Sequence, residues 1–332
     1  MRTSTEFTWL QLRTHSWTGK AAIAFGGAVA HRIPRMSELP RQLISVSRVV
    51  VLSLSVLAAS SAPAQAQPLT ARQVIDRIKA NVGVPWAEPT VDTIKAGDPD
   101  TPVQGIAVTM MATLDVLQRA AAAGHNLVIT HEPTFYDHQD PTDGLVRESD
   151  PVTAAKLKFI ADHHMVVWRF HDYSHRKQPD LIQTGVLRAL GWSASQDKES
   201  DWIVKVPETS LAAMVADIQK RLAPHALRVV GDPTLKITTV ALVPGAAGFA
   251  MHRQALQRGD VQVLVIGEAR EWETVEYVDD AVAAGQRKAL ILVGHIPSEQ
   301  PGMEHATKWI KTFVTEVPVV FVPARDPFWK AK

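Results

Sequence analysis

The chain has 332 residues, of which 46% are apolar and 21% charged, and its formal net charge is +1. This length and balance predict a globular protein of one large or two medium domains, and 35 basic against 34 acidic residues argue against a nucleic-acid binder with a basic face. The sequence contains no cysteine, which excludes a thiol nucleophile, a cysteine zinc site and any disulfide, so metal ligands must be histidines and carboxylates.

The N-terminal segment has the pattern of a secretory signal peptide. Arg41 and Arg48 precede an apolar run at residues 49–59, and an Ala-x-Ala cleavage signal ends at Ala66. A run of about 11 apolar residues is well short of the roughly 20 that span a bilayer as a helix. We therefore expect cleavage near Ala66, a periplasmic location and no stable membrane anchor afterwards.

Two stretches precede this cleavage point. Residues 36–66 form the predicted signal peptide, whereas residues 1–35 read as neither a domain nor a linker. Met36 is therefore a candidate for the true start of translation, and the mature chain would begin at Gln67.

After the cleavage point, helical and extended patterns alternate. In chain order, the first elements are a helix capped by Thr70 and ending near Gly83, a strand at 105–111, a helix at 113–123, a strand at 126–130, a helix from Pro151 to about Asp162, a strand at 165–170 and a helix at 179–190. Right-handed crossovers should make these strands parallel, so that their carboxyl ends share one edge of the sheet. His131 and His171 would lie at that edge.

A second set of elements follows a polar stretch at 193–200, which we interpret as a linker. In chain order, it comprises a strand at 202–206, a helix at 210–222, strands at 227–230 and 237–243, a helix at 247–256, a strand at 261–266, a helix at 271–284, a strand at 289–293, a helix near 303–314 and a strand at 319–322.

The sequence thus predicts an α/β fold with two domains. If His295 shares a site with His131, the last elements must return to the first domain. We therefore assign residues 67–192 and 288–332 to a metal-binding α/β domain and residues 193–287 to a second α/β domain.

Side chains able to bind metals follow two of the predicted strands in the first half. His131 and Glu132 come directly before Pro133, which halts the strand where ligands would project. The next strand is followed by three candidates within five residues: His171, Asp172 and His175. Each group is also compatible with a solvated loop or a surface cluster of histidines.

A third group lies near the C-terminus. His295 and Glu299 are four residues apart and bracket Pro297, so both can face one ion if a helix starts near Ser298. Upstream, Gly245 and Gly248 follow a strand and precede a helix, which is typical either of an anion cradle at a helix N-terminus or of a simple tight turn.

The order of these motifs resembles the NIF-three-like dinuclear-metal proteins, some of which carry the name type 2 GTP cyclohydrolase I. The motifs are Thr-His-x-Pro at 130–133, a histidine-led segment at 171–175, the glycine turn at 245–248, Ile-Gly-Glu at 266–268 and Gly-His-x-x-Ser-Glu at 294–299. The resemblance covers about residues 69–325. It implies two similar α/β domains, the first built from both chain ends, a pair of divalent ions in a cleft, and a homo-oligomer, commonly a hexamer.

Two positions depart from the family pattern. Family members usually have His-His where this chain has His131-Glu132, and His-Thr-x-x-Asp where it has a segment ending in His175. The two exchanges compensate in charge. The ligands that the resemblance implies are His131, Glu132, His175, His295 and Glu299. Glu299 is the candidate bridging carboxylate, with Glu132 as a second, while His171 or Asp172 could replace His175 as a ligand.

Such a site predicts a metal-dependent hydrolase. Two divalent ions (Zn, Mn or Fe) can activate water against a small substrate, for which phosphorylated and cyclic molecules are both candidates. His171 or Asp172 would orient or deprotonate the water, and Glu268 would approach from the second domain or serve only as a structural capping acid. The alternative is a non-catalytic metal-binding or scaffold protein. An exported protein would not meet intracellular GTP, so we do not expect cyclohydrolase activity.

Overall fold

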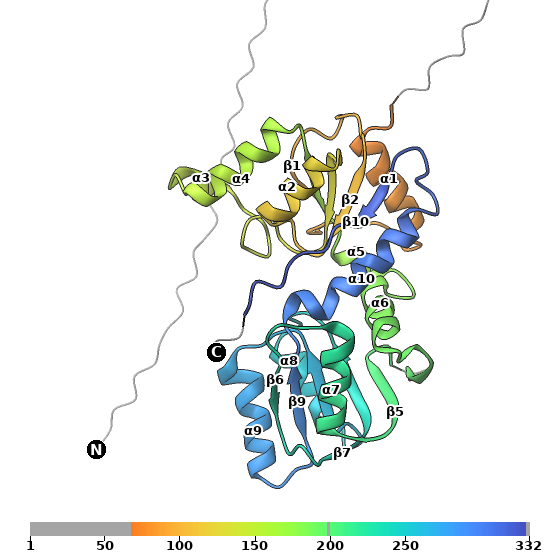
Figure 1. The fold of residues 1–332 in the computed structure, drawn as a ribbon, viewed down its shortest axis with the longest axis vertical. Coiled ribbons are helices and arrows are strands. Elements are labelled where there is room, and N and C mark those ends of the chain that lie inside the picture. Colours follow the sequence, from red (N-terminus) through yellow and green to blue (C-terminus); the bar gives the residue numbers. More distant parts are fainter. Residues whose placement is uncertain (1–67, 198–199, 330–332) are drawn as a thin grey trace, which may run out of the picture. The chain divides into compact units, whose positions relative to one another are not determined.

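The computed structural model describes residues 68–197 and 200–329, which form a mixed α/β structure with two five-stranded sheets (Figure 1). The predicted signal peptide and the candidate start at Met36 lie outside the described residues. Within the described part of the chain, none of the helices has the length and apolar character needed to cross a membrane.

The first sheet has the strand order β1-β4-β3-β2-β10. Its strands are β1 (Ile94–Ala96), β2 (Ile106–Thr109), β3 (Leu127–Thr130), β4 (Val166–Arg169) and β10 (Val319–Phe321). Strands β2, β3 and β4 run parallel, as predicted. Strand β10 is also parallel and pairs with β2 although it lies more than 200 residues later in the chain, whereas β1 is antiparallel to β4 (Figure 1). Strands β2, β3 and β4 are buried along their whole length, as apolar strands of a covered parallel sheet are.

Local signals set the helices of this part of the chain. Helix α1 (Ala71–Asn81) begins at Thr70, whose side chain forms a capping box with Gln73. Helix α2 (Leu114–Ala122) is capped by Thr113, and α4 (Pro151–Asp162) by Asp150 with Pro151 at its first position. The sequence patterns predicted all three. Helices α3 (Asp143–Arg147) and α5 (Asp172–Arg176) were not predicted, since five residues are too few to show helical periodicity.

The second sheet has the order β5-β7-β8-β9-β6. Its strands are β5 (Ile203–Ser210), β6 (Arg228–Val230), β7 (Lys236–Val243), β8 (Val263–Ile266) and β9 (Ala289–Leu292), and its helices are α7 (Leu211–Leu222), α8 (Phe249–Gln257), the π-helical turn η2 (Glu271–Val275) and α9 (Glu276–Ala283). The central strands β7, β8 and β9 are parallel, and the two edge strands are antiparallel to their neighbours.

Strand β9 lies in a different sheet from the one predicted. We placed residues from 288 onward in the first domain, but β9 pairs with β8 and β6 in the second sheet. The chain leaves that sheet at Gly294, where φ is +98°. The sequence could not show this, because a short apolar strand buried on both faces fits the middle of either sheet.

Helix α10 (His295–Ile310) begins eight residues before its predicted start near Met303. Pro297 and Pro301 weaken the helical pattern of these earlier turns. However, Pro297 is in the first turn, where its missing N–H has no helical partner to lose, so only Pro301 interrupts the helical hydrogen bonds. The early start places His295 and Glu299 one turn apart within the helix.

Helix α10 packs closely on α6 (Leu181–Leu190), and glycines make this contact possible (Figure 1). A Cβ on Gly185 would lie 2.4 Å from the carbonyl oxygen of Pro301, and a Cβ on Gly302 would lie 2.4 Å from Cα of Ile182. Within α6, Ile182 belongs to the core of the first sheet, whereas Val186 belongs to a core of the second. The α6–α10 pair therefore joins the two cores.

Candidate metal centre

The carboxyl ends of β3 and β4 bring the first ligands together. The backbone N–H of His131 still bonds to Thr109 and that of Glu132 to Met110, so both residues leave the sheet in a fixed direction. His171 follows β4, and its ring lies 4.6 Å from that of His131, centroid to centroid. The prediction that both histidines share one sheet edge is confirmed.

Helix α5 then returns His175 to the same place. The centroid of its ring lies 5.1 Å from that of His131 and 5.2 Å from that of His171. The start of α5 is held by Asp92, a buried carboxylate that accepts the backbone N–H groups of His171, Asp172 and Tyr173 at 2.7–2.9 Å. Since Asp92 also fixes the direction of the chain as it leaves β4, the placement of His171 and His175 depends on it.

The first turns of α10 supply the remaining candidates. Nε2 of His295 lies 3.0 Å from Oε2 of Glu299 and 3.4 Å from Oε1 of Glu132. The same Oε2 of Glu299 is 3.7 Å from Nε2 of His131. The segments that follow β3 and β4 and the first turns of α10 thus meet at one point.

Two groups of these side chains could hold a metal ion, and they share His131. One consists of His131, His171 and His175, and the other of His131, Glu132 and Glu299; within each, one ligand atom per residue lies within 4.8 Å of the others. The structure therefore supports metal binding by histidine and glutamate.

Four histidine rings share one orientation: each Nδ1 faces an oxygen that can accept a hydrogen bond. The Nδ1 atoms face the carbonyl of Phe170 (from His131, 3.3 Å), Asp172 (from His171, 3.0 Å), Asp180 (from His175, 2.9 Å) and Glu268 (from His295, 3.4 Å). A carbonyl or carboxylate can only accept, so each Nδ1 carries a hydrogen. Nε2 of His131 then keeps its lone pair, whereas Nε2 of His295 also faces carboxylates, those of Glu299 and Glu132, and carries a hydrogen as well. Metal-binding histidines usually donate a hydrogen bond from one ring nitrogen in the way that these Nδ1 atoms do.

The Nε2 atom of His131 provides a further test of whether a metal fits. It is buried and has no hydrogen-bond partner, and the whole residue is 0% exposed. Burial, with His171 and His175 beside it, lowers the pKa of His131 well below its usual value, so the ring is neutral. A buried, unpartnered lone pair costs free energy, and a cation bound there would remove that cost. The residues present fit a divalent metal ion.

The carboxylates are ionised and balanced by His295. Burial alone would raise the pKa of Glu132, but the hydrogen bond from His295 and the neighbouring histidines hold it well below its usual range. Conversely, burial alone would lower the pKa of His295, but its carboxylate neighbours raise it to about 12. Without a metal, a proton on His295 supplies the positive charge that bound divalent ions would otherwise supply.

A buried arginine beneath the site was not predicted. Arg169, in β4, is 0% exposed; its Nε donates to the carbonyl of His131 at 3.0 Å, and its Nη1 donates to that of His138. Its Nη2 lies 3.6 Å from Oε2 of Glu132. One oxygen of Glu132 therefore faces Arg169, while the other faces His171 and His295. Arg169 therefore offsets the negative charge of Glu132.

The glycine turns of the second sheet fit closely around α10. A Cβ on Gly245 would lie 2.4 Å from the carboxylate of Glu299, and a Cβ on Gly267 would lie 2.5 Å from Oγ of Ser298. The amide of Gly245 donates to Ser298 Oγ, so this amide is not free to hold an anion. Position 245 requires glycine because the backbone there lies too close to Glu299 to leave room for a side chain.

The structure brings together all the residues singled out from the sequence, although their roles remain predictions. Glu268 is half-exposed and reaches His295 from the end of β8. Asp172 binds His171 and also accepts from Thr90, so it supports a ligand candidate rather than joining either group. Sequence reasoning missed the supporting residues Asp92, Arg169 and Asp180. Asp180 lay inside the predicted helix at 179–190, whereas the observed α6 begins at Leu181 with Asp180 as its N-cap.

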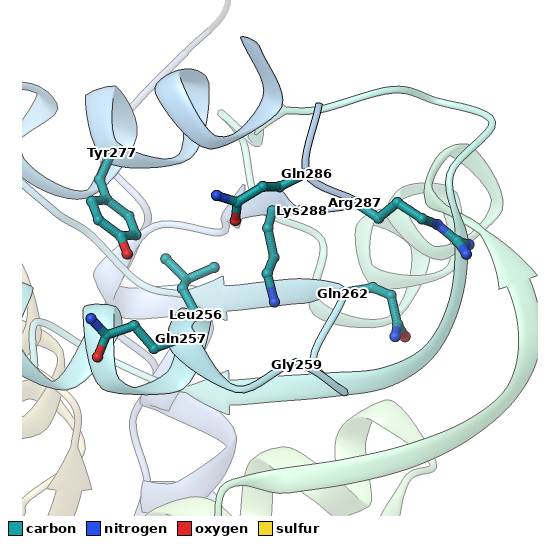
Figure 2. Close-up of a pocket in the computed structure, with 8 residues that line it drawn as sticks. All are labelled: Leu256, Gln257, Gly259, Gln262, Tyr277, Gln286, Arg287 and Lys288. Carbon is teal, nitrogen blue, oxygen red and sulfur yellow. The ribbon is translucent and has the colours of Figure 1, made fainter. Parts of the chain in front are cut away.

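Two cavities of about 410 Å³ occur near the second sheet. One is lined by the ligand candidates Glu132, His171, His175, His295 and Glu299 and by apolar side chains that follow β7. The other, shown in Figure 2, lies at the amino ends of β8 and β9 between α8 and α9, and no histidine or carboxylate lines it. Only the first has the chemistry of a metal centre.

Fold and site together define a mixed α/β protein with a candidate His/Glu metal centre at the carboxyl ends of its strands. The chain belongs to the Duf34/NIF3 (NGG1p interacting factor 3) family, whose model matches residues 69–327. The resemblance seen in the sequence motifs is thereby confirmed.

Individual relatives agree with this assignment. Over 245 residues the chain is 28% identical to the GTP cyclohydrolase 1 type 2 homolog of Chlamydia pneumoniae, covering 71% of this chain and 90% of that protein. The crystal structure of Staphylococcus aureus protein SA1388 matches with a TM-score of 0.62 at 17% identity, and that of a Bacillus cereus protein related to NIF3 with 0.62 at 13%. Each match covers 80% of this chain and 100% of the other, and at these identities both support the fold alone.

Proposed function

We propose that this protein is a metal-dependent hydrolase that binds two divalent ions and acts on a small molecule. The observation that carries the proposal is the shared orientation of the histidines, each with its Nδ1 on an oxygen acceptor. Nε2 of His131, His171 and His295 faces the carboxylates of Glu132 or Glu299. His131 offers a single lone pair and can hold one ion, so the two ions we propose would divide the ligands. One would use His131 with His175 and the other His295 with Glu132, and Glu299 lies between His131 and His295. Mixed histidine and carboxylate ligation suits Zn, Mn or Fe.

The residues around the centre would have distinct roles in hydrolysis. Bound divalent ions supply Lewis acidity and lower the pKa of a coordinated water. Glu299 lies between His131 and His295 and is our bridging carboxylate. His171, with Asp172 on its Nδ1, would take the proton from the attacking water, and Glu268 would relay that proton to the leaving group.

A non-catalytic metal-binding protein is the second candidate, and one observation favours it. His171, which the hydrolase needs as a base, also belongs to a candidate ligand group with His131 and His175. If His171 binds an ion permanently, no histidine of this group remains to move a proton. The metal content of His171→Ala separates the two functions: it stays at the wild-type level if His171 is a base and falls if His171 is a ligand.

Elemental analysis after metal-replete purification tests the proposal. We expect about two ions per chain in the wild type and a loss of at least one in Glu132→Ala, His175→Ala and Glu299→Ala. Glu304→Ala is the matched control, since Glu304 lies on the same helix but is exposed. Fewer than one ion per wild-type chain, or full metal content in all three ligand variants, would exclude the dinuclear centre.

We further propose that the chain is exported and assembles with copies of itself, as expected from its signal-peptide pattern and from the family. N-terminal sequencing of protein from the native source should give Gln67 as the first residue, and a peptide from residues 1–35 would contradict a start at Met36. Light scattering should give a mass several times that of the monomer, six times for a hexamer.

A further inference from the structure

The metal-site cavity has two walls of opposite character. Its polar wall carries the ligand candidates, and its other wall is apolar and comes from the second sheet. The apolar wall consists of Trp202, Leu242, Val243, Pro244, Ala246, Ala247 and Met251, with Ile182 beside it. An apolar surface facing a metal centre has no role in holding the ions, so it requires another explanation.

The apolar wall is firmly held. Leu242 and Val243, at the end of β7, are 2% and 3% exposed and belong to the cores of the second sheet. Trp202 precedes β5, and Met251 lies on α8; both are half-buried, pack on the same core and line the cavity. An indole ring and a thioether in one wall offer polarisable surface to an apolar or aromatic group.

The charges that line the cavity do not suit an additional phosphate group. Among its described lining residues, none is lysine or arginine, and the charged groups other than histidine are carboxylates, including Asp180 and Asp201. Arg169, the arginine beneath the site, is fully buried and already bonded to two backbone carbonyls. Phosphate-binding sites generally supply such guanidinium or ammonium groups.

From this two-walled cavity we infer the substrate class: an uncharged carboxylic amide or ester that bears an apolar or aromatic group. Its carbonyl would lie at the metal centre and its apolar group against Trp202 and Met251. In hydrolysis, the oxygen of water bonds to the carbonyl carbon, the carbon–nitrogen or carbon–oxygen bond breaks, and the leaving amine or alcohol takes up a proton. The inference rests on the proposed function, because the carbonyl needs the metal centre.

Hydroxamates test the two walls separately, because the hydroxamate group binds metals and its substituent can be varied. We would measure binding of acetohydroxamate and benzohydroxamate to metal-replete protein by calorimetry. The phenyl group should tighten binding by about tenfold or more if it buries roughly 60 Å² or more of apolar surface on the wall. Trp202→Ala and Met251→Ala should each reduce this gain at least threefold, with acetohydroxamate affinity and metal content unchanged.

The control is Trp272→Ala, since Trp272 is 71% exposed and does not line the cavity. It should keep the full gain. Equal affinity for the two hydroxamates, or a gain that survives both wall variants, would overturn the inference while leaving the metal centre intact. Failure of both compounds to bind would reject the metal centre and the inference together.

A third ligand tests the exclusion of phosphate. Benzohydroxamate with a para-phosphate should bind at least tenfold more weakly than benzohydroxamate itself, since no basic side chain is placed to receive the phosphate. If the phosphate tightens binding, the wall contains an anion site, for which the N-terminus of α8 would be the candidate, and the substrate class we infer is wrong.

Discussion

The two cavities beside the second sheet are equal in volume and differ in what lines them. At the carboxyl ends of the strands, half-buried histidines contact the buried carboxylates Glu132 and Glu299. At the amino ends, amides, a tyrosine and two cations surround the second cavity, which we call the hollow (Figure 2). The polar side chains that form hydrogen bonds there bond mostly to backbone groups. Lys288, for example, donates to the carbonyls of Arg258 and Val261. Volume therefore does not distinguish a functional site, whereas convergence of buried titratable groups does.

Removing the shared ligand should have the largest effect. His131→Gln should lower metal affinity by roughly 100-fold or more, above the 10- to 100-fold that outer partners of a metal typically contribute. Metal titration with a competing chelator measures this. The control Gln257→Ala, in the hollow, should bind metal as the wild type does. An unchanged metal affinity in His131→Gln would show that the first cavity is not a metal centre.

A buried lysine, Lys156, and a partly exposed one, Lys288, should respond differently to pH. Lys156 donates to the carbonyl of Thr134 in the ligand-bearing loop, and burial lowers its pKa to about 8 from 10.5. Between these values the unfolded chain holds a proton that the folded chain has lost, so the free energy of unfolding rises with pH, by about 3 kcal/mol in all.

Chemical denaturation of Lys156→Met from pH 7.5 to 10.5 should show that this rise has disappeared. Burial also lowers the pKa of Lys288, which is less enclosed, so the rise lost in Lys288→Met should be smaller. If the stability of the wild type does not increase relative to that of Lys156→Met across this pH range, the pKa of Lys156 is not lowered by folding.

Crowding the α6–α10 contact should lower both the stability of the fold and the affinity for metal. Gly185→Ala places a Cβ against Pro301 and should destabilise the fold by about 1–3 kcal/mol while also weakening metal binding, because α10 carries His295 and Glu299. Gly144→Ala is the matched control: it is also in a helix, its Cβ meets nothing within 4 Å, and it should be neutral or slightly stabilising. Thermal unfolding and metal titration of both variants decide this.

Asp180 both accepts a hydrogen bond from His175 and caps α6, and a substitution can separate these two roles. Asp180 bonds His175 through Oδ2 and caps α6 through Oδ1. In Asp180→Asn the amide oxygen can still cap the helix, but the amide NH₂ cannot accept from His175, so metal affinity should fall about tenfold with stability nearly unchanged. Asp180→Ala should lose a further ~1 kcal/mol of stability. Equal metal affinity in Asp180→Asn and wild type would show that His175 needs no such partner.

The smallest effect is expected in the hollow. Oε1 of Gln262 accepts the backbone N–H groups of Thr238 and Thr239 at 2.9 Å, so Gln262→Ala should cost about 1 kcal/mol of stability and leave metal binding unchanged. A loss of metal in this variant would show that the two ends of the sheet are coupled.

The sequence by itself determined the elements with strong local signals and the identity of the candidate ligands. The caps at Thr70 and Asp150, the helical pattern at 113–123 and the apolar strands gave the first three parallel strands and their helices. Crossover handedness then placed His131 and His171 on one edge, and the motif order gave the family.

Only the tertiary structure decided which sheet β9 joins, where α10 begins, and which side chains support the ligands. These depend on contacts between segments far apart in the chain: β9 with β6, α10 with α6, Asp92 with α5, and Arg169 with Glu132. Local patterns carry no information on such contacts. The sequence of an apolar strand or of a buried charged residue is the same whichever segment packs against it in the fold. The apolar wall was hidden for the same reason, since Trp202 and Met251 are 49 residues apart and face one cavity only after folding.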